Sequence, residues 1–232
     1  TSPRRVRHLR VAVTLAALVA LLWGPLGSTA ADTPGADEDA WARLMTASLE
    51  RTTLGSAPKP AAAWAVVDGA DTHTGGLAGA GPDTRFSIGS LTKTFTAIAI
   101  LQLADDGRIV LDDPVLGHPG VSAPPGVTVR ELLTHTGGVR DHRDDLDSAD
   151  FAYANRNYEI LGDLITAISG RPYGDYLRER IFAPLGMTNS SVAPVADADA
   201  EAGHYLAFGI PVPGRDASEP STPPGATGVV ST

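Results

Sequence analysis

The chain has 232 residues, of which 43% are hydrophobic and 19% charged, with no cysteine and a formal net charge of −9. This is the composition of a globular protein, long enough for one large domain or two small ones. The lack of cysteine excludes a disulfide scaffold, a cysteine nucleophile, a cysteine-ligated zinc site and a lipid-anchored N-terminal cysteine. The negative charge argues against a general nucleic-acid-binding surface, so we expect no nucleic-acid partner.

The N-terminal segment 1–30 has the plan of a secretory signal. Four arginines precede an apolar run from Val11 to Trp23, and small residues follow it as far as Ala31. The apolar run is shorter than the roughly 20 residues that span a bilayer, so a cleaved signal is favoured over a membrane anchor. We therefore predict a secreted protein that meets a membrane only during export, by the general secretory or the twin-arginine route. Cleavage would remove the four arginines and take the formal charge from −9 to −13.

Beyond the signal, the first elements predicted are a linker, a helix and a hairpin. Residues 31–39 are small and acidic and form the linker, and apolar residues at helical spacing predict an amphipathic helix over 38–52. The short apolar run 62–67 ends in Asp68-Gly69, which predicts a strand and a turn. The glycine-rich stretch 75–81 lacks the spacing of a phosphate-binding loop, so we predict a strand and a loop there, with the strand as a candidate for the second strand of a hairpin.

Further helices are predicted between Lys93 and Pro184. The one that follows Lys93 is apolar on nearly all sides, so we expect it to be buried in the middle of the domain. A capping box at Thr128 opens a second, short helix, and two apolar stripes predict a third and a fourth. The residues expected to end helices are Gly107, Gly170 and Pro184.

Ser90 and Lys93 carry the first chemical signal, at the start of the apolar helix. Residues three apart share one helix face, so the lysine amine can reach the serine oxygen. A serine hydroxyl is a weak nucleophile until a base takes its proton, and burial would favour the neutral, basic form of the lysine. The helix dipole and the Ser90 N–H would both stabilise an oxyanion. The alternative is a serine that caps the helix beside a solvated lysine.

Tyr153 and Asn155 carry the second signal. A phenol can relay a proton between a serine oxygen and a leaving group when a nearby cation lowers its pKa. In an extended segment, residues two apart project to the same side, so Asn155 would contact both a substrate amide and Lys93. The alternatives are a tyrosine of the core and an asparagine that merely caps the next helix.

Together these segments resemble the serine beta-lactamase and D-alanyl-D-alanine carboxypeptidase superfamily, and within it the class C beta-lactamase-related serine hydrolases. The similarity covers roughly 40–232. It implies an α+β fold (an α/β sandwich) of the beta-lactamase/transpeptidase type, with an antiparallel sheet and a helical subdomain. The matching segments, in the family's order, are 86–113, LLTHTGG at 132–138, YANRNYEILG at 153–162 and PLGM at 184–187.

The resemblance implies an exported serine hydrolase with no metal or organic cofactor. Ser90 would be the acyl-accepting nucleophile and Lys93 would help to deprotonate it. Tyr153 would be the proton shuttle, and Asn155 would bind the acyl-amide group of the substrate. The substrate would be a small molecule or a peptide: a D-Ala-ended peptide, a beta-lactam, or a simple ester or amide. Nothing in the sequence predicts the oligomeric state.

Two histidines, His135 and His142, are candidates for a catalytic or a metal-binding role. In the family, the stretch that contains His135 is a structural turn beside the site, so it implies no role for His135 in proton transfer. His142 lies among acidic residues in the charged segment 140–150, where a solvated loop is favoured over a metal site. This segment and Arg156 depart from the family's pattern and suggest a more open site.

The family's third motif, Lys/His-x-Gly, does not follow Asn155 in this sequence. The family also continues beyond the position of Thr232, so we expect a C-terminally truncated hydrolase domain over 40–232, whose sheet would lack strands. Such a chain would be poorly folded or inactive. The alternative function is therefore a non-catalytic or inactive fragment that binds a cell-wall peptide or a protein partner through the same cleft.

Overall fold

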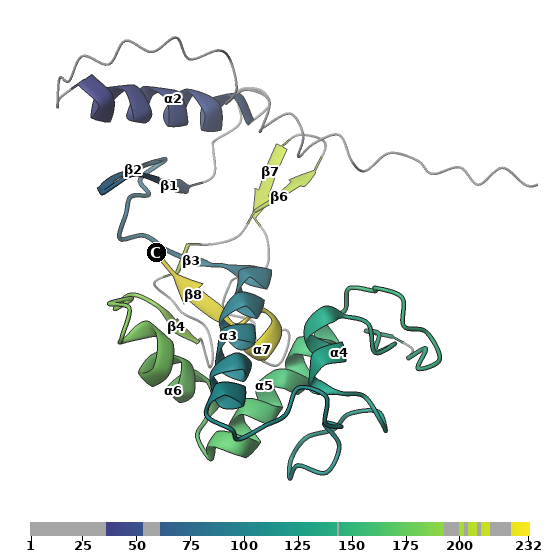
Figure 1. Cartoon of the computed structure of the whole chain (residues 1–232). Helices are drawn as coiled ribbons and strands as arrows, with labels where there is room; N and C mark the ends of the chain where they lie inside the picture. The colour runs from purple at the N-terminus through teal and green to yellow at the C-terminus, as the bar shows by residue number, and fades with distance from the viewer. Residues whose placement is uncertain are drawn as a thin grey trace, which may run out of the picture. The chain divides into compact units, whose positions relative to one another are not determined.

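The computed structural model describes residues 36–52, 61–142, 144–192, 200–201, 204–207, 210–213 and 224–232. The chain divides into two compact units, 1–39 and 40–232. The predicted signal and most of the predicted linker lie outside the described residues. Helix α2, Ala36–Thr52, confirms the amphipathic helix predicted over 38–52 (Figure 1).

Strands β1, Ala62–Asp68, and β2, Asp71–Leu77, form an antiparallel hairpin. The predicted hairpin is therefore confirmed, but its second strand begins at Asp71 rather than at residue 75. The chain turns back at once because Gly69, with φ +62°, allows a two-residue turn. Glycine is required at position 75 for a steric reason, because a Cβ there would lie 2.5 Å from the ring of Trp64.

A four-stranded sheet has the order β4-β8-β3-β5. Strand β8 pairs antiparallel with both β3 and β4, whereas β5 pairs parallel with β3. The predicted antiparallel sheet is thus confirmed for β4, β8 and β3, and β5 adds a parallel strand at the edge beside β3. The bounds are Arg85–Ser87 for β3, Ser191–Val192 for β4, Ala200–Glu201 for β5 and Val229–Ser231 for β8. A separate hairpin consists of β6, His204–Ala207, and β7, Ile210–Pro213.

The helical subdomain packs around α5, which contacts α3, α4, α6 and α7 (Figure 1). Its core side chains, which include Ile100, Leu103, Leu161 and Leu164, are fully buried. The bounds of these elements are Gly89–Leu91 for the 3₁₀ turn η1, Thr92–Asp105 for α3, Val129–Thr134 for α4, Asn155–Ser169 for α5, Tyr173–Leu177 for α6, Arg178–Phe182 for the π-helical turn η2 and Pro224–Thr227 for α7.

Helix α3 is not buried on all sides, so that expectation was wrong. Ile98 is 38% exposed and Leu101 is 50% exposed. The buried stripe, which includes Lys93, Thr96 and Leu103, is the face that meets α5, α6 and α7. The apolar sequence identified a helix correctly, but the neighbouring elements determine which of its faces is covered.

The helix boundaries follow local chemistry closely. The Thr128 hydroxyl accepts a hydrogen bond from the Glu131 N–H, and the Glu131 carboxylate accepts one from the Thr128 N–H at 2.9 Å, which confirms the capping box. Gly107 and Gly170 take positive φ values of +69° and +70° at the ends of α3 and α5. Within the described segments, we find no helix with both the length and the apolar character needed to cross a membrane.

Candidate active site

The Ser90–Lys93 pair is built by local helix geometry and is held in place by β8. Ser90 is exposed in the turn η1, and Lys93, in the first turn of α3, is only 7% exposed. The Lys93 Nζ donates to Ser90 Oγ at 3.3 Å, as the spacing predicts. Val229 of β8 bonds to both sides of this turn, because its N–H donates to Thr92 Oγ1 at 3.1 Å and its carbonyl accepts from the Ile88 N–H at 3.1 Å.

Lys93 joins three separate parts of the chain. Besides Ser90 Oγ, its Nζ donates to Asn155 Oδ1 at 2.7 Å and to the carbonyl oxygen of Ala226 at 3.1 Å. An ammonium group has three N–H bonds, and three acceptors surround this one. The three contacts therefore fix the Lys93 side chain between Ser90, Asn155 and α7.

Tyr153 lies on the other side of the nucleophile. Its hydroxyl donates to Ser90 Oγ at 2.7 Å, and the Lys93 Nζ lies 4.9 Å from the centre of its ring. Partial burial alone would raise the pKa of Tyr153, but the interactions of its hydroxyl with Lys93 and Ser90, and the charge of Lys93, outweigh burial and lower that pKa. The ring is 52% exposed, so the alternative of a core tyrosine is wrong.

Asn155 is the first residue of α5, yet its side chain does not cap that helix. Ala154 before it is extended, with φ −146° and ψ +137°, so Tyr153 and Asn155 project to the same side, as predicted. The Asn155 Oδ1 instead accepts the hydrogen bond from Lys93. The structure thus brings together all four residues that the sequence singled out.

His135 contacts this segment more closely than the sequence indicated. The residue is 8% exposed, and its Nδ1 lies 3.3 Å from the Ala154 N and 2.9 Å from the Asn157 Nδ2. No spacing rule connects residues 135 and 154, so only the tertiary structure reveals this contact. The carbonyl of Ala226 was missed as well, because a backbone acceptor carries no residue-type signal.

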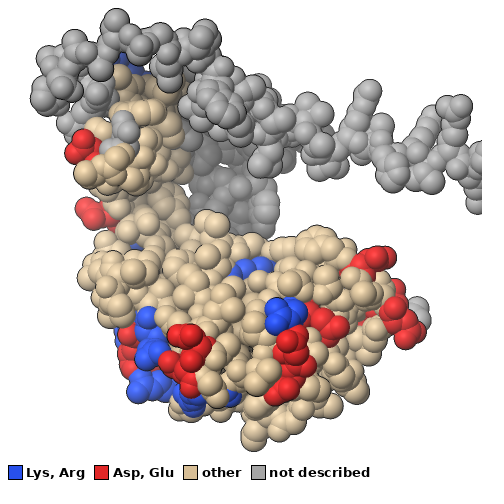
Figure 2. All heavy atoms as spheres, viewed as in Figure 1, with Lys and Arg blue, Asp and Glu red and all other residues tan. Residues whose placement is uncertain are grey.

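The charged loop 140–150 lies beside the site. The Asp141 carboxylate accepts from the Arg156 N–H at 3.0 Å, and the Arg156 guanidinium donates to the Ser122 carbonyl oxygen at 3.0 Å. His142 is exposed, and the part of the chain that the structure describes contains no cluster of three metal-ligating side chains. Figure 2 shows acidic side chains gathered at the edge of the molecule where this loop lies in Figure 1.

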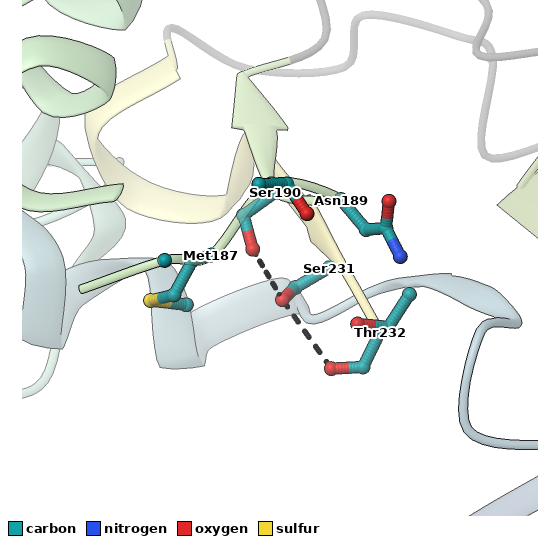
Figure 3. A pocket seen from close by; sticks show the side chains of 7 residues that line it. Met187, Asn189, Ser190, Ser231 and Thr232 are labelled. Carbon is teal, nitrogen blue, oxygen red and sulfur yellow. Dashed lines mark hydrogen bonds between the residues drawn. The ribbon is translucent and has the colours of Figure 1, made fainter. Parts of the chain in front are cut away.

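A cavity of about 180 Å³ lies elsewhere, between the segment 186–190 and the end of β8. The Ser190 and Ser231 hydroxyls bond to each other at 2.7 Å beside it (Figure 3). Its lining contains no acid, base or histidine, and no residue of the Ser90 site. The chemistry therefore concentrates around Ser90.

An α+β fold with a serine and a lysine one turn apart on a helix, and a tyrosine and an asparagine facing them, defines a class of serine hydrolases. Sequence comparison agrees: residues 42–232 match the Beta-lactamase family, and the chain belongs to that family. The resemblance and the α+β fold predicted from the sequence are thus confirmed.

Two curated relatives illustrate the similarity. The putative penicillin-binding protein PbpX of Bacillus subtilis (strain 168) is 34% identical over 129 residues, which cover 47% of this chain and 33% of that protein. Penicillin-binding protein 4 of Amycolatopsis lactamdurans is 30% identical over 141 residues, or 48% of this chain and 37% of that protein. The matches therefore span about a third of the length of these relatives.

Solved structures extend the similarity to the fold. A D-stereospecific amidohydrolase from Streptomyces sp. superposes with a TM-score of 0.63 at 28% identity, covering 74% of this chain and 64% of that one. A class C beta-lactamase superposes with a TM-score of 0.66 over 87% of this chain and 64% of that one. Its 20% identity supports the shared fold alone.

Proposed function

We propose that this chain is an exported serine hydrolase that forms an acyl-enzyme on Ser90. One observation carries the proposal: the Tyr153 hydroxyl and the Lys93 ammonium both bond to the same serine oxygen, at 2.7 and 3.3 Å. A nucleophile within hydrogen-bond reach of a base, which a third group in turn holds and tunes, is the arrangement that nucleophilic catalysis requires.

Acylation would begin with Tyr153 as its phenolate, which the nearby Lys93 charge stabilises. The phenolate takes the Ser90 proton while Oγ forms a bond to the substrate carbonyl carbon. The tetrahedral intermediate then breaks its bond to the leaving group, which receives that proton from Tyr153. In the second half, the phenolate removes a proton from water while the water oxygen forms a bond to the acyl carbon. Tyr153 then returns that proton to Ser90 Oγ as the bond between Oγ and the acyl carbon breaks.

Binding of the substrate would use groups around Ser90. The Ser90 N–H lies in the first turn of a helix, where N–H groups have no acceptor inside the helix, so it can donate to the oxyanion. Because Lys93 holds the Asn155 Oδ1, the amide nitrogen of Asn155 is the group left to bind the acyl-amide carbonyl of a substrate.

The substrates that suit this site have a carbonyl next to a compact leaving group. Candidates are D-Ala-ended peptides, beta-lactams and small esters or amides. Relatives that are penicillin-binding proteins and a D-stereospecific amidohydrolase support this range. The proposal includes secretion, directed by residues 1–30, with membrane contact only during export. The partner would be a small-molecule or peptide substrate, and not a nucleic acid.

A second candidate is a non-catalytic protein that binds a cell-wall peptide or a protein partner through the same cleft. The observation behind it is that the Lys93 Nζ has three hydrogen-bond acceptors, which fits a lysine that holds the site together rather than one that takes a proton.

A fluorescent penicillin separates the two candidates. We expect the purified chain to take the label covalently, with a matching mass increase, and Ser90→Ala to take none. Ser87→Ala is the matched control, since Ser87 is also exposed and lies only three residues away, and it should label normally. Labelling of Ser90→Ala would refute the assignment of the nucleophile. A wild-type chain that binds the penicillin reversibly without labelling would support the non-catalytic candidate.

A further inference from the structure

His135 holds the backbone on both sides of Tyr153. It ends helix α4 with φ +59°, a left-handed conformation that turns its ring toward the site. Its carbonyl oxygen accepts from the Ala152 N–H at 3.0 Å, and its Nδ1 accepts from the Ala154 N–H at 3.3 Å. The residue before Tyr153 and the residue after it are thus bound to the same histidine, one by its backbone and one by its ring.

The ring of His135 also packs against the phenol itself. The two ring centres lie 4.9 Å apart at an interplanar angle of 32°, and Tyr158 lies on the imidazole at 5.2 Å. Phe151 meets the imidazole edge-on at 5.8 Å. The orientation of Tyr153 toward Ser90 therefore depends on a ring that is itself fixed by its neighbours.

Hydrogen bonding determines where the proton of this imidazole lies. The Nδ1 faces two N–H donors, from Ala154 and from the Asn157 amide, so it must carry the lone pair and Nε2 must carry the proton. Burial lowers the pKa of His135, the charge of Lys93 lowers it further, and Asp141 opposes both. The other titratable groups that face the ring are the phenols of Tyr153 and Tyr158.

We propose that His135 is a positioning residue for catalysis, which fixes Tyr153 beside Ser90 as long as its Nδ1 is unprotonated and releases that segment when Nδ1 takes a proton. The inference rests on the proposed function of Ser90. It assigns His135 no transfer of a proton to or from the substrate.

The Asn157 amide can form a hydrogen bond with His135 Nδ1 in either protonation state, by taking one of two orientations. Its Nδ2 donates to the imidazole now, while its buried Oδ1 has no hydrogen-bond partner among the described residues. A protonated Nδ1 can donate to that oxygen if the Asn157 amide turns over. The Ala154 N–H then faces a donor instead of an acceptor, and a buried N–H without an acceptor is costly. The segment that carries Tyr153 is thereby destabilised.

Two substitutions separate the roles of the ring. His135→Asn keeps an acceptor, because the asparagine Oδ1 is as many bonds from Cα as the histidine Nδ1, and asparagine tolerates a positive φ. His135→Phe keeps a stacking ring but provides no acceptor. We expect His135→Phe to lower kcat/KM for acylation by about 10²-fold at pH 7.5, and His135→Asn to be closer to wild type than to His135→Phe. His118→Asn and His118→Phe are the matched controls and should both behave as wild type.

The pH profile gives a readout that a purely structural role would not change. Below the pKa of Tyr153, log kcat/KM should fall by about one decade per pH unit, because one base must be free. Below the pKa of His135, which lies under the usual 6.5, the wild-type slope should steepen to about two decades per unit. In His135→Asn the slope should stay near one. The proposal would be overturned if the slope of log kcat/KM against pH also steepened to two decades per unit in His135→Asn. It would likewise be overturned if His135→Phe were more active than His135→Asn.

Amide exchange measured by NMR tests the positioning without any catalysis. The Ala154 N–H should exchange about tenfold faster in His135→Phe than in wild type or His135→Asn. The Ala152 N–H should remain protected in all three, because its acceptor is the carbonyl oxygen of residue 135. Unchanged exchange at Ala154 would refute the proposal even in an active enzyme. A wild-type chain that takes no penicillin label but shows the expected exchange would instead contradict the proposed function alone.

Discussion

The two halves of the candidate site are built in different ways. Ser90 and Lys93 lie one helical turn apart, so the geometry of a single turn brings their side chains to 3.3 Å. Tyr153 and Asn155 come from more than sixty residues further along the chain. Tyr153 reaches Ser90, and Asn155 reaches Lys93, only because His135 and the N-terminus of α5 hold an extended segment in place.

Because the two halves are built differently, different substitutions should disrupt each of them. Almost any sequence that keeps the turn helical preserves the local half. The distant half depends on tertiary contacts, and a small shift of Tyr153 would separate it from Ser90. Lys93 connects the two halves, since its ammonium bonds to Ser90 and to Asn155. We therefore expect a substitution of Lys93 to disturb both halves, and other substitutions to disturb only one of them.

Lys93→Met should have the largest effect, because it removes the cation on which both halves depend. We expect acylation by the fluorescent penicillin to slow by about 10⁴-fold. Thr94→Ala, an exposed neighbour in α3, is the control. A loss of less than tenfold in Lys93→Met would contradict the central role of the lysine.

Tyr153→Phe tests the distant half alone, and its expected loss is about 10²–10³-fold in kcat/KM. Because the pKa of Tyr153 is lowered, its phenolate forms below the usual pH of 10.0. The wild-type rate should therefore rise with pH and level off below that value, and the Phe variant should lack this rise. A pH–rate profile checks both points. The same rise in the Phe variant would mean that another group is the base.

Leu161→Ala tests the helix that presents the distant half. Leu161 is fully buried in α5, so the substitution should lower the free energy of unfolding by about 2–5 kcal/mol, because it leaves a cavity. Thr128→Ala removes only the local cap of α4 and should lower it by about 1 kcal/mol. Urea unfolding measures both. An equal loss in the two variants would show that α5 does not depend on tertiary packing as we infer.

The smallest effect is expected on the surface. Asp112 and Arg130 form a salt bridge at 2.6 Å, but both side chains are largely exposed. Solvent and salt screen such pairs, so Asp112→Asn should leave Tm and acylation unchanged within error. A clear drop in Tm would indicate that this pair supports α4 and, through it, His135.

Much of the local structure could be predicted from the sequence. The helix ends at Gly107 and Gly170 and the capping box at Thr128 follow from residue types that have one favoured conformation at those places. The start of β2 was placed wrongly, because polar residues at 71–74 give no alternating apolar signal. The exposed face of α3 was missed, since its apolar residues leave open which neighbours cover them.

Sequence patterns were enough to identify a serine, a lysine one helical turn further on, and the family to which the chain belongs. The three acceptors around the Lys93 ammonium, and the hydrogen bond from the Ala154 N–H to His135, could be found only in the folded molecule. The two sets of features differ in the range of the interactions that produce them. Helix geometry and capping act between residues a few positions apart, whereas these contacts join α3, α4, α5 and α7, whose meeting depends on the packing of the whole core.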